Sequence, residues 1–241
     1  MKISIITVCY NSESTIERTI RSVVNQTYND FEYIIIDGKS TDNTLNIIMK
    51  YQELYPDIIS FFSEPDSGIY DAMNKGINKA TGDLIGIINS DDYYENNALE
   101  TVSKYYDCDK KYQIIYGELR IINKDEEELR IEFNNINNIS KNTLMHPSTF
   151  ISKSIYNDIC TYRTDYRSAS DYAFFIEMSK HKDINFIPVY SILANFTIGG
   201  VSETLLGKAE TNIIKYENGM IDKRHYHINK LKIYFKKILK I

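Results

Sequence analysis

The chain has 241 residues, 43% of them hydrophobic, which is enough for one large domain or two tightly joined halves around an ordinary core. The formal net charge of −5 argues against general nucleic-acid binding, and no apolar run approaches the ~20 residues that a membrane-spanning helix needs. The cysteines, Cys9, Cys108 and Cys160, lack metal-ligand spacing, which predicts reduced thiols in a cytoplasmic protein.

The first half of the chain alternates strands with helices. Short apolar runs predict strands at Ile3 to Val8, Phe31 to Ile36, Ile58 to Phe62 and Leu84 to Ile88. The first run is too short for the core of a secretory signal, so we interpret it as a strand. Helices are expected at Asn11 to Gln26, around Leu45 to Met49, and at Tyr70 to Ala80. Ser12 or Ser14 is a candidate cap of the first helix, and Ser40 to Asp42 of the second. Strands separated by helices imply parallel pairing, and apolar residues on both faces are typical of buried parallel strands.

The pattern changes after Asp92. We expect helices at Ala98 to Tyr106, Ser170 to Ser179 and Leu205 to Tyr216, and a late strand at Val189 to Phe196. An acidic turn at 125–128 separates two runs that predict an antiparallel hairpin, Ile114 to Ile122 and Leu129 to Phe133. A polar segment at 134–142 predicts a mobile loop, after which Thr149 to Ile151 returns to the sheet. No linker is visible, so the halves are expected to share one core.

The tail from Asn229 to Ile241 carries only positive charges. Leu231, Tyr234 or Phe235, Ile238 and Ile241 recur at intervals of three and four residues, which predicts a short basic amphipathic helix. Such a helix could lie on an anionic bilayer, or its apolar stripe could dock on the domain or on a partner subunit. The chain is therefore expected to be soluble or peripheral.

Paired carboxylates follow the fourth predicted strand. Asp91 and Asp92 come directly after the apolar run that ends at Ile88, and ligands bind at this edge of open α/β sheets. Two adjacent acids repel each other unless a cation or strong donors lie between them, which favours Mg²⁺ or Mn²⁺ holding a phosphorylated ligand. The alternative is an ordinary turn or helix cap.

Five motifs in order resemble those of family 2 glycosyltransferases with the GT-A fold. They are Thr7 to Asn11, Ile36 to Thr44, Ser63 to Ile77, Thr81 to Asp83, and Asn89 to Asp92. The match covers about the first 95 residues strongly and residues 146–178 more weakly. It implies an α/β fold with a Rossmann-like nucleotide-sugar-binding half (1–95), a smaller mixed-sheet acceptor half of the same domain (96–200), and a C-terminal helical region (201–241).

The resemblance also implies a donor site. Tyr10 would stack on the nucleotide base, or instead pack against the second helix. Asp37 would bond to the base or ribose, because Ser40 and Asp42 are available to cap the following turn. Backbone N–H groups at the start of the third helix suit anions. The implied donor set is Thr7, Cys9, Tyr10, Asn11, Asp37, Asp66, Ser67, Gly68, Asp71, Asn74, Lys75, Asn89, Ser90 and Asp91.

One position departs from the family pattern. Many relatives carry an arginine where this chain has Met73, so diphosphate contact there is in doubt, and Lys75 either substitutes or is solvated. Asp92 is the expected ligand of Mn²⁺ or Mg²⁺, and Asp91 supports the metal or contacts the ribose.

An inverting transfer needs a base for the acceptor hydroxyl. Asp171 matches the family's acid–aromatic motif, although it could instead cap the helix that follows. His146 resembles residues that line the sugar or acceptor cavity, or it is structural.

The implied function is transfer of a hexose from a nucleoside-diphosphate sugar, UDP above all, to a glycan or lipid-linked oligosaccharide. This would serve bacterial surface polysaccharide synthesis at the inner face of the cytoplasmic membrane. The alternative is a catalytically inactive nucleotide-sugar-binding or scaffold protein of the same fold.

Three other classes of protein lack support in the sequence. A dinucleotide oxidoreductase or a P-loop protein would need glycine-rich loops that are absent. A nucleotidyltransferase would need a glycine-rich loop that contains arginine after the first strand, and this is absent too. Nucleic acid is not an expected partner. Donor sugar, acceptor, linkage and oligomeric state stay open.

Overall fold

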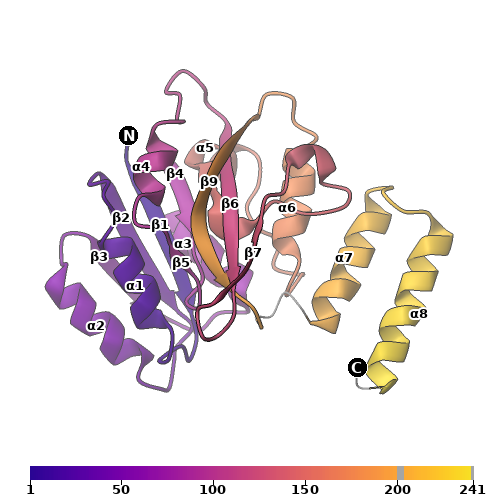
Figure 1. The fold of residues 1–241 in the computed structure, drawn as a ribbon, viewed down its shortest axis with the longest axis horizontal. Helices are drawn as coiled ribbons and strands as arrows, with labels where there is room; N and C mark the ends of the chain where they lie inside the picture. Colours follow the sequence, from indigo (N-terminus) through magenta and orange to yellow (C-terminus); the bar gives the residue numbers. More distant parts are fainter. Residues whose placement is uncertain (200–203, 240–241) are drawn as a thin grey trace.

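A mixed β-sheet forms the centre of the molecule (Figure 1). The computed structural model describes residues 1–199 and 204–239, with side chains up to residue 234. Over these residues the sheet has nine strands in the order β3-β2-β1-β4-β8-β6-β9-β5, with β7 paired to β6. The strands are β1 (Ile3–Cys9), β2 (Phe31–Asp37), β3 (Ile59–Ser63), β4 (Leu84–Ile87), β5 (Tyr93–Tyr94), β6 (Gln113–Ile122), β7 (Glu128–Glu132), β8 (Thr149–Ser152) and β9 (Asn185–Thr197).

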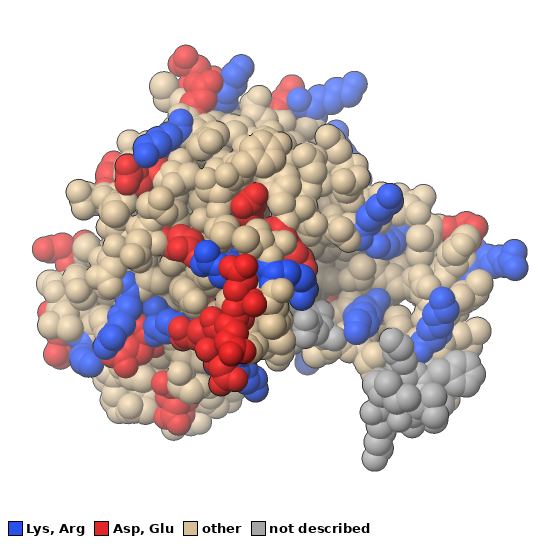
Figure 2. Space-filling model, viewed as in Figure 1, with Lys and Arg blue, Asp and Glu red and all other residues tan. Residues whose placement is uncertain are grey.

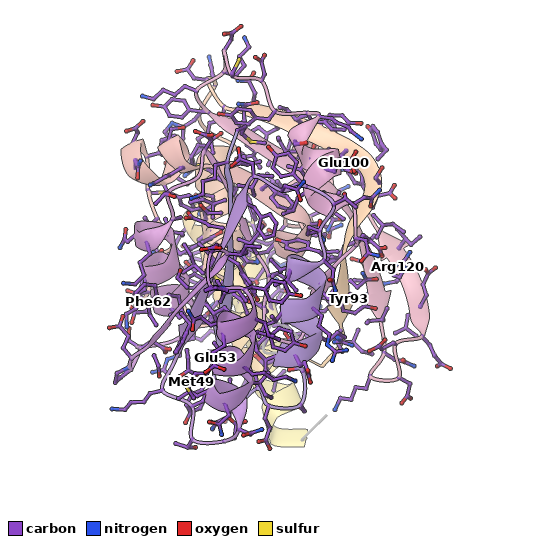
Figure 3. All side chains as sticks on the ribbon, turned by 90° about the vertical axis from the view of Figure 1, so that its left-hand side faces the viewer. Met49, Glu53, Phe62, Tyr93, Glu100 and Arg120 are labelled. Atoms are coloured by element: carbon purple, nitrogen blue, oxygen red, sulfur yellow. The ribbon has the colours of Figure 1, made fainter. Side chains whose placement is uncertain are left out.

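The first four strands confirm the predicted parallel arrangement. β1 pairs in parallel with β2 and β4, and β2 pairs in parallel with β3. The expectation that all four are buried on both faces is wrong for β3, because this strand is the edge of the sheet. Phe62 on β3 is 37% exposed, and the ammonium of Lys79 lies 3.7 Å from the centre of its ring. Figure 3 looks onto this edge.

Antiparallel strands continue the same sheet. The β6–β7 hairpin and the return of β8 to the sheet are confirmed, and β8 pairs with both β4 and β6. Hence one sheet crosses from the first half of the chain into the second. The two-residue strand β5, which pairs with β9, was not predicted, nor was the helix Lys153–Asp158. The polar segment expected to be a loop contains a single 3-10 turn, Ile136–Asn138.

Helices cover both faces of the sheet (Figure 1). They are α1 (Ile16–Val24), α2 (Thr44–Leu54), α3 (Ile69–Lys79), α4 (Ala98–Ser103), α5 (Lys153–Asp158), α6 (Ser170–Met178), α7 (Leu205–Glu217) and α8 (Lys223–Leu239). Ile3 and Ile5 of β1 belong to one apolar cluster with α1, α2 and α4, whereas Ile6 and Val8 belong to another with α3, α5 and α6. This division follows from the alternation of side chains along a strand. Both layers converge on the carboxyl ends of the parallel strands.

A glycine lets α3 approach the sheet closely. A Cβ at Gly76 would lie 2.5 Å from Cγ2 of Ile6, closer than two carbon atoms can pack. The C-terminal half of α3 is thereby held close to the sheet.

The helix caps differ from the sequence expectation in both α1 and α2. The N-cap of α1 is Thr15 rather than Ser12 or Ser14, and the carbonyl of Ser12 accepts from the amides of Thr15 and Ile16. The N-cap of α2 is Asn43, and Asp42, the residue before it, accepts from the amide of Thr44 at 3.0 Å. The difference at α1 arises because the loop after β1 turns once more before the helix begins.

The C-terminal helices form an outer layer. Ile214 of α7 packs with Tyr172 and Ile176 of α6, and α8 packs against α7 (Figure 1). The expected tail helix is confirmed and begins earlier, at Lys223, while Phe235, Ile238 and Ile241 of its predicted stripe lie outside the described side chains. Among the described helices, none combines the length and apolarity needed to cross a bilayer.

Candidate active site

A cavity of about 850 Å³ opens at the carboxyl edge of the parallel strands. Its walls come from the loops after β1 and β4, the start of α3, strands β6, β7 and β9, and the segments that precede β8 and α6. Ten of the residues expected from the sequence line it: Cys9, Tyr10, Asn11, Asp66, Gly68, Asn89, Ser90, Asp91, His146 and Asp171. Residues more than 150 positions apart in the chain therefore meet in one space.

The loop after β1 is rigidly tied to its neighbour. Asn11 adopts a positive φ of 48°, its amide donates to Oγ of Ser40 at 2.8 Å, and its Oδ1 accepts from the amide of Thr41 at 2.8 Å. Tyr10 is 62% exposed and lines the cavity, so the alternative that it packs against a helix is wrong. The ring is available for stacking on a planar ligand.

Two residues of the implied donor set are buried beneath the cavity. Thr7 is fully buried and accepts a hydrogen bond from the hydroxyl of Tyr33 at 2.9 Å. Asp37 is also fully buried, and its carboxylate accepts from the Ser40 hydroxyl at 2.5 Å and from the Ser63 hydroxyl at 2.6 Å. The expectation that Ser40 leaves Asp37 free is therefore wrong, because Ser40 is itself a partner of that carboxylate.

Four further expected residues shape the start of α3 and are not among the cavity's lining residues. Asp71 accepts from the amide of Ser67 at 2.9 Å and lies 3.5 Å from the ammonium of Lys75. Lys75 also donates to the Pro65 carbonyl at 2.7 Å. Asn74 exchanges two hydrogen bonds with the backbone of Tyr162. These side chains hold the loop in which Gly68 has a φ of 133°, while the uncharged Met73 lines the cavity.

The paired carboxylates occupy two different environments. Asp91 lines the cavity, whereas Asp92 is fully buried and accepts from the amide of Thr197 at 3.0 Å through Oδ1. Burial raises the pKa of the Asp91 carboxyl, and burial together with the neighbouring Asp91 charge raises the pKa of Asp92 further. When both carboxyl groups are ionised they repel each other in a buried environment, and a nearby positive charge would stabilise them.

These residues fit a divalent cation. Oδ2 of Asp92 is buried and has no hydrogen-bond partner among the described residues. Carboxylate oxygens are the preferred protein ligands of Mg²⁺ and Mn²⁺, and phosphate oxygens and water commonly complete the shell. The sequence analysis expected Asp92 to be the metal ligand and Asp91 to support it. In the structure Asp91 is the acid that faces the cavity.

Asp171 lies across the cavity on the first turn of α6. The hydroxyl of Tyr70 donates to its Oδ1 at 3.0 Å. The N-cap of α6 is Ala169, so the alternative that Asp171 caps this helix is wrong. Its carboxylate is therefore oriented by a buried tyrosine of α3 rather than by its own helix.

His146 lies in the wall that precedes β8. The residue is 9% exposed, and its ring lies 6.0 Å from that of Tyr162. Burial lowers the pKa of His146, and the charge of Asp171 opposes this shift. The neutral imidazole is favoured, which suits a hydrogen-bonding role toward a ligand.

Two further residues close to the site escaped the sequence analysis. Glu210 of α7 accepts from the backbone amides of Arg167, Ser168 and Ala169 at 2.9, 2.8 and 3.0 Å, and so caps the helix that carries Asp171. No local sequence pattern identifies Glu210, because its partners lie some 40 positions earlier in the chain.

The side chain of Arg167 is exposed in the cavity wall and forms no ion pair among the described residues. A guanidinium at this place can bind phosphate or carboxylate. The sequence could have pointed to Arg167 because it lies only four residues before Asp171.

Comparisons with known proteins agree with this geometry. The family model described as "Glycosyl transferase family 2" matches residues 4–167. A "PGL/p-HBAD biosynthesis glycosyltransferase" of Mycobacterium tuberculosis is 27% identical over 207 residues, which are 85% of this chain and 80% of the relative.

Two solved structures share the fold. S. aureus TarS 1-349 in complex with UDP-GlcNAc aligns with a TM-score of 0.70 at 18% identity, covering 94% of this chain and 69% of the other. The mannosyltransferase PcManGT from Pyrobaculum calidifontis in complex with GDP-Man and Mn²⁺ aligns with a TM-score of 0.68 at 15% identity, covering 96% and 69%. The family model covers more than half of the chain. The chain belongs to glycosyl transferase family 2 and is a glycosyltransferase with the GT-A fold.

Proposed function

We propose that this enzyme transfers a hexose from a UDP sugar to a hydroxyl group of a glycan or lipid-linked oligosaccharide, with inversion at the anomeric carbon. The observation that carries the proposal is the placement of Asp91 and Asp171 in the walls of one cavity. A nucleoside-diphosphate sugar needs a polar end for its phosphates, and an attacking hydroxyl needs a base on the opposite side of the sugar. Asp91 can meet the first need only through a bound cation that bridges its carboxylate to the phosphates, and Asp171 can meet the second.

Asp171 is the base in this proposal. The acceptor oxygen attacks the anomeric carbon, its proton passes to the Asp171 carboxylate, and the bond from that carbon to the diphosphate oxygen breaks. The electron pair of the broken bond leaves with the nucleoside diphosphate. Tyr70, whose hydroxyl is 3.0 Å from Oδ1 of Asp171, keeps the carboxylate in place. A fixed base of this kind contributes about 10²–10⁴-fold to the rate.

The donor would lie against the loop after β1. Tyr10 offers its exposed ring to the base, and the cluster of Asn89, Ser90 and Asp91 faces the ribose and phosphates. Asp91 and Asp92 would hold Mn²⁺ or Mg²⁺, which when bound neutralises charge on the departing diphosphate. Arg167 lies in the same cavity and can contact the diphosphate, which compensates for the uncharged Met73.

Support for the donor and acceptor comes from relatives and from the cavity. TarS 1-349 binds UDP-GlcNAc and PcManGT binds GDP-Man with Mn²⁺, so nucleotide sugars are the donor class to test first. The cavity walls include the apolar side chains of Leu119, Ile121 and Phe196. An acceptor with an apolar portion, as in a lipid-linked oligosaccharide, suits these walls.

The test is nucleoside-diphosphate release with UDP-GlcNAc, UDP-glucose, UDP-galactose and GDP-mannose, each with Mn²⁺ and a panel of glycan acceptors. We expect turnover with a UDP sugar, and Asp171→Asn is expected to lower it about 10²–10⁴-fold while donor binding, measured by calorimetry, stays unchanged.

The matched control is Asp183→Asn, which changes an exposed acid outside the cavity and should leave turnover unaltered. Unchanged turnover in Asp171→Asn would reject this residue as the base. Tight donor binding without turnover on any acceptor would favour the inactive nucleotide-sugar-binding alternative.

A further inference from the structure

One side of α8 is used in packing against α7. The rings of Tyr226 and Tyr216 stack with centres 4.7 Å apart. Nδ2 of Asn229 donates to Oδ1 of Asn212 at 3.0 Å, and Nδ2 of Asn212 donates to the Tyr226 carbonyl at 3.1 Å. These contacts fix the rotation of α8 about its own axis.

The opposite side of α8 presents an apolar stripe. Ile228, Leu231 and Tyr234 are 39%, 56% and 59% exposed. Residues three apart lie next to each other on a helix surface, so the three side chains form one band along the axis. From the 100° turn per residue, the band is centred roughly opposite the side occupied by Tyr226 and Asn229. Three large apolar side chains in one exposed band are unusual on a polar helix, and they mark a contact surface.

Positive charges border the stripe. Lys232 lies on one edge, while Lys223 and Lys230 lie toward the other, and all three are exposed. The sequence from residue 223 to 241 holds seven Lys or Arg and no acid, in a chain whose net charge is −5. Figure 2 shows Lys and Arg over the C-terminal helices, whereas acidic groups gather on the β6–β7 hairpin. The complementary surface is therefore anionic and apolar together.

We propose that α8 docks on an anionic lipid bilayer, lying in the plane of the headgroups. Ile228, Leu231 and Tyr234 enter the boundary between headgroups and acyl chains, and the flanking lysines reach phosphates through their flexible stems. A bilayer fits better than a protein groove because lysines border both long edges of the stripe, where a groove would bury them.

The inference does not depend on the proposed transfer reaction, and membrane binding can be measured without donor or acceptor.

The test is co-sedimentation of the full-length protein with vesicles of phosphatidylglycerol and phosphatidylcholine, against vesicles of phosphatidylcholine alone. We expect binding to the anionic vesicles that weakens steeply between 50 and 500 mM NaCl, as screening predicts. Leu231→Glu and the pair Lys230→Glu/Lys232→Glu are each expected to weaken it at least about tenfold.

Matched controls separate this surface from general effects. Leu54→Glu introduces the same change at an apolar residue of α2 that is 63% exposed, and Lys110→Glu/Lys182→Glu reverses two exposed charges elsewhere. Both should bind as the wild type does, and thermal melts should show all variants folded. Equal binding to neutral vesicles, or loss of binding in the controls alone, would overturn the proposal. So would a dimer in light scattering that Leu231→Glu dissociates while vesicle binding is absent, because the stripe would then serve self-association.

Discussion

Asp92 illustrates how burial and charge conflict at a single residue. Its pKa is raised in the folded protein, so folding favours the protonated carboxyl. The free energy of folding gained from this group is fully present below about pH 3.8, the usual pKa of an aspartate. That gain is lost as the pH rises through the higher pKa of the folded state. Near neutrality an ionised Asp92 therefore opposes folding. A bound divalent cation would reverse the sign of this effect.

Asp92→Asn should accordingly stabilise the metal-free protein at neutral pH. The amide keeps the oxygen that accepts from Thr197 and removes the buried charge, so we expect the melting temperature to rise by a few degrees, and the gain to grow from about pH 4 to pH 8. Mn²⁺ added with a nucleoside diphosphate should raise the melting temperature of the wild type but not of this variant. Differential scanning calorimetry across this pH range, with and without Mn²⁺, measures both effects. A variant that is less stable at every pH, or one that still responds to Mn²⁺, would show that Asp92 is a purely structural acid.

At the scale of elements, α6 depends on a cap supplied by α7. Three backbone amides before α6 converge on the Glu210 carboxylate, which is 7% exposed. These amides belong to the N-cap and to the two residues before it, so the Glu210 carboxylate fixes the chain that leads into the first turn, where Asp171 lies. Asp171, the proposed base, is thus positioned by a residue that is not among the cavity's lining residues.

Glu210→Ala is expected to destabilise the protein by about 3 kcal/mol, because buried amides lose charged hydrogen bonds. Turnover should fall with it, since Asp171 loses its fixed position. Urea unfolding followed by circular dichroism gives the free energy of unfolding. Glu177→Gln, which removes an exposed ion pair with Lys180 on α6 itself, is the control and should change stability by no more than about 0.5 kcal/mol. Similar losses in both variants would contradict the capping role.

At the scale of the whole molecule, one sheet unites the first and second halves of the chain. β8, from the second half, inserts beside β4 from the first, and Phe150 packs against Gly86 and stacks on Tyr94 with ring centres 5.5 Å apart. Phe150 is fully buried. The two halves should therefore unfold together.

Phe150→Ala tests this unity. Removing a buried ring is expected to lower the free energy of unfolding by about 3–5 kcal/mol. Urea unfolding followed by tyrosine fluorescence and by circular dichroism should still give coincident transitions, shifted together. Two separated transitions, with only one displaced, would mean that the halves fold independently.

The sequence by itself determined the strands β1 to β4, their parallel pairing and the cluster of polar residues at their carboxyl ends. Apolar runs of strand length between amphipathic helices allow few other arrangements, and strand ends such as Asn89 to Asp92 then reach the same edge. The resemblance to family 2 glycosyltransferases, rather than any local pattern, singled out Asp171 and His146, and both line the cavity.

Only the tertiary structure decided which of these side chains reach the cavity. Thr7 and Asp37 are sequestered by Tyr33, Ser40 and Ser63, and Asp171 takes its orientation from Tyr70 and, through α6, from Glu210. Apart from Ser40, these partners lie 26 to 101 positions away in the chain. A hydrogen bond across that separation depends on how the elements pack, and no local pattern of residue types encodes it.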